Sequence, residues 1–204
     1  TGLALKIGNE AMNNEQDIIS DDEALIQHLW DKLRKSRSLQ SDWRIRAKED
    51  YDFFAGRQWD TTTLGKLKEE GRPAVVFNRI VRVLNGIIGL EIQNRQEVNY
   101  LPREPGDQPA VSVMNEASKW VRDNCDAEDE ETESFQDCAI CGEGWTNTRL
   151  DYEEDEEGRI IIERIDPLSM VWDSDAKKRN HDDARWVAHV EKMSREDIKT
   201  LWPD

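Results

Sequence analysis

Apolar residues recur at helical spacing as far as about residue 142, and beyond that point the apolar segments are short and rich in the β-branched and aromatic residues typical of extended strands. The first 19 residues show neither period and are rich in Asn and Glu, so residues 1–19 are expected to form a mobile leader. Regular structure is expected from Ser20, which forms the pattern of a helix capping box with Glu23.

Two helices are predicted after this cap. The first has a helical apolar face made of Leu25, Leu29, Trp30 and Leu33. The polar run "RKSRSLQSD" at 34–42 ends or bends it. A second apolar face begins at Trp43 and ends near Gly56, as expected for a helix that packs against a core.

The stretch "LGKLKEEGRPAVVFNRI" at 64–80 is predicted to be a loop, because Pro73 fixes its own φ and disfavours helical geometry at the preceding residue. A long helix is expected from Val76 to Asn94. It is predicted to be a central packing element whose buried residues are Ile80, Leu84, Ile87 and Ile88.

A further amphipathic helix is predicted from about Pro109 to Cys125. The acidic run "DAEDEETE" at 126–133 is interpreted as a charged linker. It leads into a shorter helix that carries Phe135, Cys138, Ala139 and Cys141 and ends at Gly142 and Gly144.

The period then becomes extended. "WTNTRLDY" and "RIIIERID" flank the polar turn "EEDEEG", which predicts a β-hairpin with an acidic tip. "MVWD" and "ARWVAHVEKM" are predicted as two more strands, and Ser194 with Asp197 is expected to cap a last helix through Trp202. The expected fold class is α+β, with N-terminal helices followed by a small antiparallel sheet with a hairpin and a short terminal helix.

Composition and charge narrow the function classes. The chain has 204 residues, 37% of them hydrophobic and 35% charged, and eight tryptophans argue for a packed core. A net charge of −16 argues against a surface that binds nucleic acid by neutralising phosphates. No apolar run reaches the roughly 18 residues of a membrane span, so the chain is expected to be soluble and intracellular.

The three cysteines do not form a disulfide framework. Cys138 and Cys141 have the spacing of half a zinc site, yet no second ligand pair stands nearby in the sequence. All three, including Cys125, are therefore interpreted as small buried apolar residues of a helix, and Cys138 and Cys141 are predicted to be reduced and free of metal.

The aspartate-rich stretch from Ile162 to Val187 is the strongest candidate for chemistry. Its spacing does not fit an EF-hand calcium loop, because lysines stand at positions that need oxygen ligands. Asp166, Asp173 and Asp183 remain an alternative, as a metal site at strand ends in a nucleic-acid-processing enzyme. No companion lysine motif and no phosphate-binding loop accompany them.

The favoured interpretation assigns the aspartates to turns and to ion pairs with nearby cations. The expected partners are Arg164, Lys177, Lys178 and Arg185. On this interpretation the chain has no catalytic, cofactor-binding or metal-binding residues.

Five stretches, in chain order, resemble the portal protein of short-tailed bacteriophages. They are "AKEDYDFFAGRQWD" at 47–60, "GRPAVVFNRIVRVLNGIIGLEIQNR" at 71–95, "VNYLPREPGDQPA" at 98–110, "GEGWTNTRLDYE" at 142–153 and "ERIDPLSMVWDSDAKKRNHDDARWV" at 163–187.

The resemblance implies a structural subunit without enzymatic activity and without cofactors. Such proteins form a dodecameric ring at one capsid vertex, through which double-stranded DNA is packaged and ejected. Terminase, scaffolding, capsid, head-completion and tail proteins are the implied partners. Residues 20–142 would then be the helical part of the portal wing and 143–204 its β part, with the stem and clip beyond Asp204, in a virion protein assembled in the host cytoplasm.

Two further hypotheses stay open beside this one. The chain is alternatively a metal-dependent enzyme using Asp166, Asp173 and Asp183, or an adaptor that binds proteins through aromatic residues. The acidic runs at 126–133 and 151–157, with six carboxylates each, are interpreted as a solvated linker and hairpin tip, or as a docking site for a basic partner.

Overall fold

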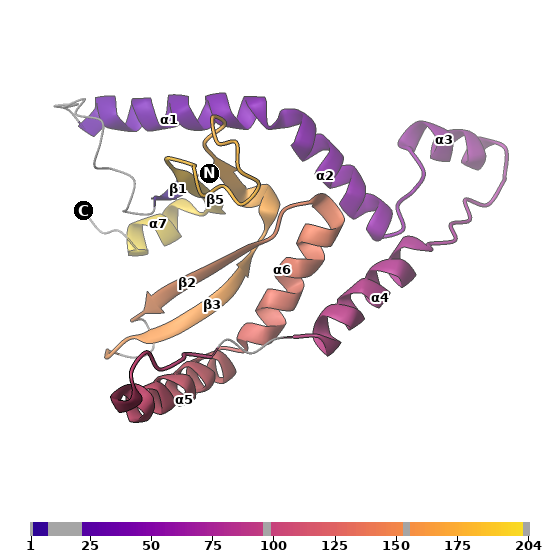
Figure 1. The fold of residues 1–204 in the computed structure, drawn as a ribbon. Coiled ribbons are helices and arrows are strands. Elements are labelled where there is room, and N and C mark those ends of the chain that lie inside the picture. Colours follow the sequence, from indigo (N-terminus) through magenta and orange to yellow (C-terminus); the bar gives the residue numbers. More distant parts are fainter. Residues whose placement is uncertain (1, 8–21, 96–98, 153–155, 202–204) are drawn as a thin grey trace. The chain divides into compact units, whose positions relative to one another are not determined.

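The computed structural model describes residues 2–7, 22–95, 99–152 and 156–201 (Figure 1). The chain folds as two compact units. The first unit contains Thr1–Ala47 and Pro167–Asp204, and the second contains Lys48–Asp166. The chain passes from the first unit to the second between Ala47 and Lys48, within a helix, and returns to the first unit between Asp166 and Pro167, just after a strand.

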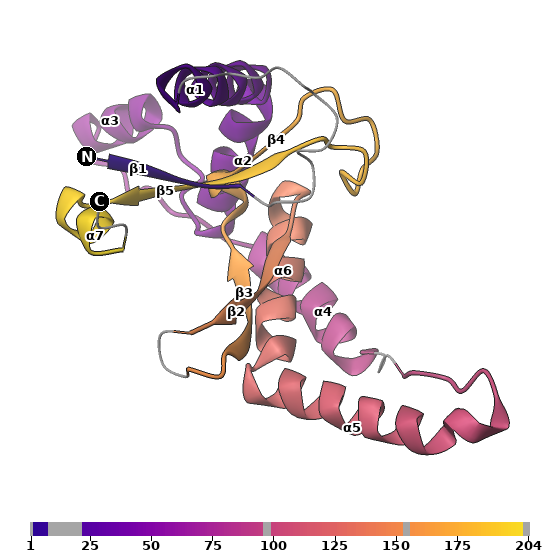
Figure 2. The ribbon, with the colours of Figure 1, turned by 90° about the vertical axis from the view of Figure 1, so that its left-hand side faces the viewer.

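The first unit combines helices with a three-stranded antiparallel sheet of order β1-β5-β4 (Figure 2). Its strands are β1 (Gly2–Ile7), β4 (Met170–Trp172) and β5 (Val187–Met193). Its helices are α1 (Asp22–Leu39), the start of α2 (Ser41–Phe54), the 3-10 turn η3 (Pro167–Ser169) and α7 (Arg195–Leu201). Val171 of β4 pairs with Ala188 of β5, which sets the register of the central pair.

The core of the first unit lies between α1 and this sheet. Leu33, Val171 and Ala188 are buried there, and Trp30, Trp186 and Val190 pack around them. Polar groups fix the junction between α1 and α2 to the edge strand β4, since the side-chain amide of Gln40 donates to the carbonyl of Trp172 at 3.0 Å. The Arg44 guanidinium likewise donates to the carbonyls of Leu168 and Met170.

The second unit is built around one central helix, α6. Its elements are α3 (Thr61–Glu69), α4 (Ile80–Gln93), the 3-10 turn η2 (Pro105–Asp107), α5 (Gln108–Asn124), α6 (Ala127–Cys141), β2 (Trp145–Asp151) and β3 (Arg159–Ile165). Strands β2 and β3 form an antiparallel hairpin in which Trp145 pairs with Ile165. Helix α6 contacts this hairpin, α4 and α5, as Figure 2 also shows.

Glycines make the turn from α6 into β2 possible. Gly142 caps α6 in the left-handed conformation at φ 85°, which most other residues adopt only with strain. A Cβ added to Gly144 would lie 2.2 Å from the carbonyl oxygen of Ser134. Strand β2 therefore packs closely on α6 because position 144 has no side chain.

The predicted fold class is confirmed, as are the helices over 41–54 and 108–124, the hairpin, the two later strands and the final helix capped by Ser194. The strands form two sheets rather than one. The two compact units also divide the chain at other places than the expected boundary near residue 142. The assignment of functional parts to 20–142 and 143–204 stays a prediction.

Three expectations about elements were wrong. Gly2–Ile7 is a strand, although structure was expected only from Ser20; the rest of the predicted leader, at 8–19, and Ser20 itself lie outside the described residues. The expected loop at 64–80 begins within α3, because Asp60 caps that helix by accepting from the Thr63 backbone N–H at 2.7 Å. The acidic run was expected to be a linker but forms the first half of α6.

The burial expected for the long helix was also largely wrong. Helix α4 begins at Ile80 rather than Val76, and Leu84 is its one buried residue. Ile80 is 39% exposed and Ile87 41% exposed, while Ile88 is half-buried. The helix is apolar on nearly all sides, but within the described chain only one side of it is covered.

Candidate functional site

The aspartate-rich stretch places Asp173 in an ion pair at the start of a loop. Its carboxylate accepts from the backbone N–H of Asp175 at 3.1 Å and from the Arg185 guanidinium at 3.0 Å. Burial alone would raise the pKa of Asp173, but these two donors outweigh it and hold the pKa below its ordinary value. Asp173 therefore orders a turn.

Asp183 closes the same loop from the other side. Its carboxylate accepts from the backbone N–H groups of Lys177 at 2.7 Å and Lys178 at 3.1 Å. The bond from Lys177 is the main reason that the pKa of Asp183 is lowered. The interpretation of these aspartates as turn formers is confirmed for Asp173 and Asp183.

Asp166, the third residue of the alternative metal site, belongs to the second unit, whereas Asp173 and Asp183 belong to the first. Among the residues that the structure describes, no three His, Cys, Asp or Glu side chains form a group that could hold a metal ion. Arg164 was expected to pair with the aspartates of this stretch, but its partner is Asp137 of α6.

The second unit has a buried polar network at this position. Asp137 is 3% exposed and accepts from the Tyr51 hydroxyl at 2.7 Å and from Nη2 of Arg164 at 2.9 Å. Burial, followed by the hydrogen bond to Asp137, raises the pKa of Tyr51 far above its usual value, so Tyr51 stays a donor. The hydrogen bond to Asp137 likewise raises the pKa of Arg164. The network connects α2, α6 and β3.

The cysteines differ from one another in burial. Cys141 is buried and Cys125 half-buried, but Cys138 is exposed, so the expectation of a buried Cys138 was wrong. Burial raises the pKa of the Cys141 thiol. That thiol donates to the carbonyl of Glu143, and it lies 3.8 Å from the Tyr51 hydroxyl. A thiol with a raised pKa is a poor nucleophile at neutral pH.

In the acidic run at 126–133, Glu128 and Glu131 form close ion pairs with arginines of the second unit. Glu128 accepts from Arg95 of the segment after α4 at 2.6 Å. Both carboxylate oxygens of Glu131 accept from Arg122 of α5 at 2.7 Å. These pairs join α6 to its neighbouring segments. The run is therefore part of a helix rather than a linker, and all of its carboxylate residues except Glu130 are exposed, as expected of a solvated run. In the other run, residues 153–155 lie outside the described residues.

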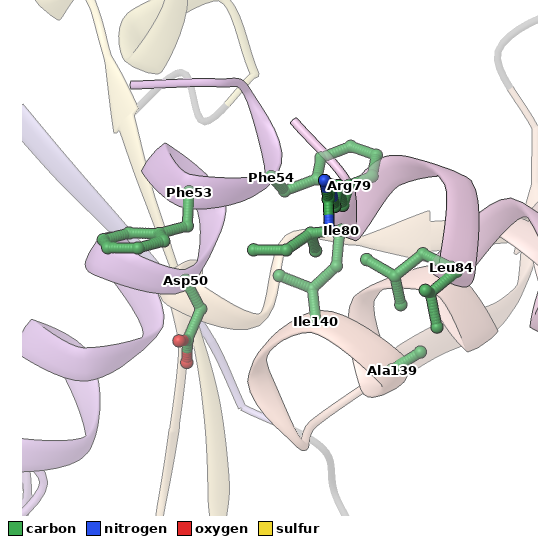
Figure 3. Close-up of a pocket in the computed structure, with 9 residues that line it drawn as sticks. Asp50, Phe53, Phe54, Arg79, Ile80, Leu84, Ala139 and Ile140 are labelled. Atoms are coloured by element: carbon green, nitrogen blue, oxygen red, sulfur yellow. The ribbon is translucent and has the colours of Figure 1, made fainter. Parts of the chain in front are cut away.

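An apolar hollow of about 420 Å³ opens between α2, α4 and α6 in the second unit (Figure 3). Asp50 and Arg79 are the charged residues at its wall, and its other lining residues are Phe53, Phe54, Ile80, Val83, Leu84, Ala139 and Ile140. The side-chain amide of Asn78 donates to the Phe54 carbonyl at 2.8 Å, which holds the segment before α4 against the end of α2.

Comparison with known families gives one match, over residues 30–204, to the model described as phage P22-like portal protein. The chain belongs to this family of portal proteins. Portal proteins are structural and non-enzymatic components of phage particles. The resemblance seen in the sequence is thereby confirmed. Among the described residues, no helix combines the length and the apolar character that crossing a membrane requires.

Two relatives are named portal protein. One, from Acyrthosiphon pisum secondary endosymbiont phage 1, is 32% identical over 190 residues, which is 82% of this chain and 25% of the relative. The other, from Helicobacter pylori bacteriophage KHP30, is 22% identical over 152 residues, which is 74% of this chain and 25% of the relative. The chain thus spans about a quarter of the length of the curated relatives that it matches.

Sequence reasoning singled out the aspartates of a portal protein loop and missed the two features that organise the second unit. The network around Asp137 joins residues more than 80 positions apart, and no local pattern signals it. The sequence of α4 does contain a signal for the hollow. This helix has more apolar residues than one packing face requires, which is typical of a helix covered on several sides.

Proposed function

We propose that this chain is a wing segment of a phage portal ring, the capsid-vertex channel through which DNA is packaged and ejected. In this role the protein is a homo-oligomer, a dodecamer by the resemblance noted in the sequence. The terminase, scaffolding, capsid and head-completion or tail proteins act on it or assemble with it during growth in the host cytoplasm. Double-stranded DNA passes through without sequence-specific binding.

The observation that carries this proposal is the apolar surface of the second unit. Its buried apolar side chains are Leu84, Ala127, Cys141 and Ile165. Large apolar side chains that are more than half exposed in the same unit include Val75, Phe77, Val83, Leu90, Ile92, Leu101, Val113, Met114 and Trp120. Soluble monomers rarely expose so many large apolar groups, whereas subunits of permanent assemblies do.

The charge of the chain fits the proposed passage of DNA. A net charge of −16 gives surfaces that do not neutralise phosphates, so DNA is not retained by counterion release. Glu128 and Glu131 of α6 are held in ion pairs with Arg95 and Arg122 of the same unit.

Electron microscopy and mass measurement of the complete protein test the proposal. Closed rings of identical subunits, seen by negative staining and matched by a discrete oligomer mass, are the expected result. A protein that stays monomeric at micromolar concentration, with and without scaffolding protein, would contradict it. Divalent-dependent nicking of plasmid DNA that is lost in Asp173→Ala would instead favour the enzymatic alternative.

A further inference from the structure

Helix α3 lies apart from the other elements of its unit. It has nine residues, none of them buried, and within the described chain it makes no extensive contact with another helix or strand. Figure 1 shows α3 clear of α4 and α6, joined to the rest of the unit by the segments before and after it. A helix of this length is marginal in water when nothing packs against it. The stability of α3 therefore has to come from its own ends.

Both ends of α3 are capped by residues next to it. Asp60 accepts from the Thr63 backbone N–H at 2.7 Å and from the Thr63 hydroxyl at 2.6 Å. At the other end Gly71 takes the left-handed conformation at φ 65°. There the backbone N–H of Arg72 donates to the Leu67 carbonyl at 2.8 Å, which is the longer-range bond of a Schellman motif. These caps stabilise the helix without any help from the core.

The segment that carries α3, residues 59–77, bonds to itself. The indole N–H of Trp59 donates to the Val75 carbonyl at 3.3 Å and so joins the segment before the helix to the segment after it. Arg72 forms an ion pair with Glu70 at 3.2 Å. As far as the chain is described, residues 59–77 form no hydrogen bond or ion pair with α2, α4 or α6.

Asn78 holds the base of this segment. Its side-chain amide donates to the carbonyl of Phe54, the last residue of α2, at 2.8 Å. Its side-chain carbonyl lies 3.4 Å from the side-chain nitrogen of Gln58, on the outgoing side of the segment. One side chain thus joins the end of α2 to both ends of an arm, which consists of residues 57–78.

The other attachments of the arm are weaker. The side-chain amide of Gln58 lies 3.4 Å from the Phe53 carbonyl, a long hydrogen bond. Arg57 pairs with Asp52 at 2.6 Å, but the two side chains are 68% and 50% exposed, and exposed ion pairs contribute little. All of these contacts lie at the base, as does the bond from Asn78.

Apolar packing does not anchor the arm either. No residue of 57–78 is buried, and the exposed fractions of Val75 and Phe77 reach 54% and 81%. Segments with few buried apolar contacts open locally at a small part of the free energy of global unfolding. The arm has this character along its whole length, whereas α6 beside it buries four residues.

We propose that residues 57–78 form a latched arm, which opens and closes as one unit, with the hydrogen bond from Asn78 to the Phe54 carbonyl as its latch. Helices α2, α4 and α6 keep their packing when the arm opens, because the arm supplies none of their buried residues. Once the latch is broken, α3 retains only its caps, so its amide hydrogens exchange with solvent. The inference concerns one subunit and does not depend on ring formation.

Hydrogen exchange measured by mass spectrometry on the complete protein tests the arm. In the wild type, the amides of α3 should exchange at least about a hundredfold faster than those of α6. Asn78→Ala should raise the exchange rate of α3 by a further five- to tenfold or so, the change expected from the loss of one hydrogen bond. The rate in α6 and the midpoint of urea unfolding should not change. Asn85→Ala, at an exposed position of α4, is the matched control and should alter none of these values.

A second variant identifies the donor. Asn78→Asp keeps the shape of the side chain but removes the N–H group that reaches the Phe54 carbonyl, so it should accelerate exchange in α3 as much as Asn78→Ala does. Protection of α3 equal to that of α6 in the wild type would overturn the inference, because the arm would then belong to the core. Unchanged exchange of α3 in either Asn78 variant would show that this side chain is not the latch. Faster exchange in α6 with a lower unfolding midpoint would assign Asn78 to the core and equally contradict the proposal.

Discussion

Helices α4 and α6 lie against each other in the second unit, and the more apolar of the two is the less buried. Helix α6 begins with a dense run of carboxylates, yet it buries Ala127, Ser134, Asp137 and Cys141. Helix α4 is the most apolar helix of the described chain and buries Leu84 alone. The charged helix is the central element, and the apolar helix lies at the surface.

This difference shows how the unit divides its side chains between folding and assembly. Hydrogen-bonded ion pairs join α6 to its neighbours, since Arg95, Arg122 and Arg164 each pair with a carboxylate on that helix, and the carboxylate paired with Arg164, that of Asp137, is buried. The exposed apolar side chains of α4 and α5 are not covered by the described chain and are available for contact with another protein surface. Changes in α6 should therefore alter stability, and changes on the exposed side of α4 should alter assembly.

The largest effect is expected from Asp137→Asn, which removes the negative charge that pairs with Arg164 and accepts a hydrogen bond from Tyr51. Breaking one side of a buried ion pair leaves the other charge without compensation, so the free energy of unfolding should fall by about 3–5 kcal/mol in urea titrations. Glu133→Gln is the matched control on the same helix. Glu133 lies 3.9 Å from Arg164 with a side chain that is 62% exposed, and its loss should cost less than about 1 kcal/mol. Equal costs would mean that the network does not organise the unit.

The second largest effect is expected within α4 itself. Leu84→Ala removes its one buried side chain and should cost about 2–5 kcal/mol in the free energy of unfolding. Val83→Ala, one residue earlier and 63% exposed, should change it by no more than about 0.5 kcal/mol. Urea unfolding of both variants checks this contrast. A similar loss in both would place Val83 in the core and remove it from the surface available for assembly.

A smaller effect is expected where β2 meets α6. In Gly144→Ala the new Cβ would lie 2.2 Å from the Ser134 carbonyl, so backbone has to shift, at about 1–3 kcal/mol of the free energy of unfolding. Gly86→Ala in α4 should instead stabilise the protein by about 0.5–1 kcal/mol, because no atom lies within 4 Å of the added methyl group. Thermal unfolding compares the two. A stabilising Gly144→Ala would show that β2 does not pack closely on α6.

The smallest effect concerns the pairing of α5 with α6 and depends on pH. The hydrogen bond from Arg122 is the main cause that lowers the pKa of Glu131 in the folded protein. A lowered carboxyl pKa stabilises the fold above the pKa of the unfolded chain, and this contribution is lost as the pH falls through the lowered value. Glu131→Gln should therefore cost about 0.5 kcal/mol near pH 7. Unfolding curves of variant and wild type should converge in acid, and a gap that widens on acidification would contradict the assignment.

The sequence predicted those elements whose signals are local. The strands at 145–151 and 159–165 are rich in β-branched and aromatic residues and flank a polar turn, and the cap at Ser194 uses a residue three positions away. Each such signal lies within a few residues of the structure that it specifies. Helix α3 was missed although its cap is also local, because the later Pro73 favoured a loop over the whole stretch.

The rest depended on partners far along the chain. The ion pairs of Glu128 with Arg95 and of Glu133 with Arg164 were not predicted, because the partners are about 30 positions apart in the sequence. The exposure of Ile80 and Ile87 could not be predicted from their periodicity either. An apolar face that packs within the subunit and one that meets a neighbour have the same sequence pattern.

The central claim is that the apolar surface of the second unit is covered by a neighbouring copy, and site-specific cross-linking tests it most directly. A photoreactive amino acid in place of the exposed Trp120 of the assembled, complete protein should form cross-links to residues of another copy, mapped by mass spectrometry. Mixed light and heavy isotope-labelled subunits distinguish these from cross-links within one chain. Cross-links confined to the same chain in intact rings would contradict the account.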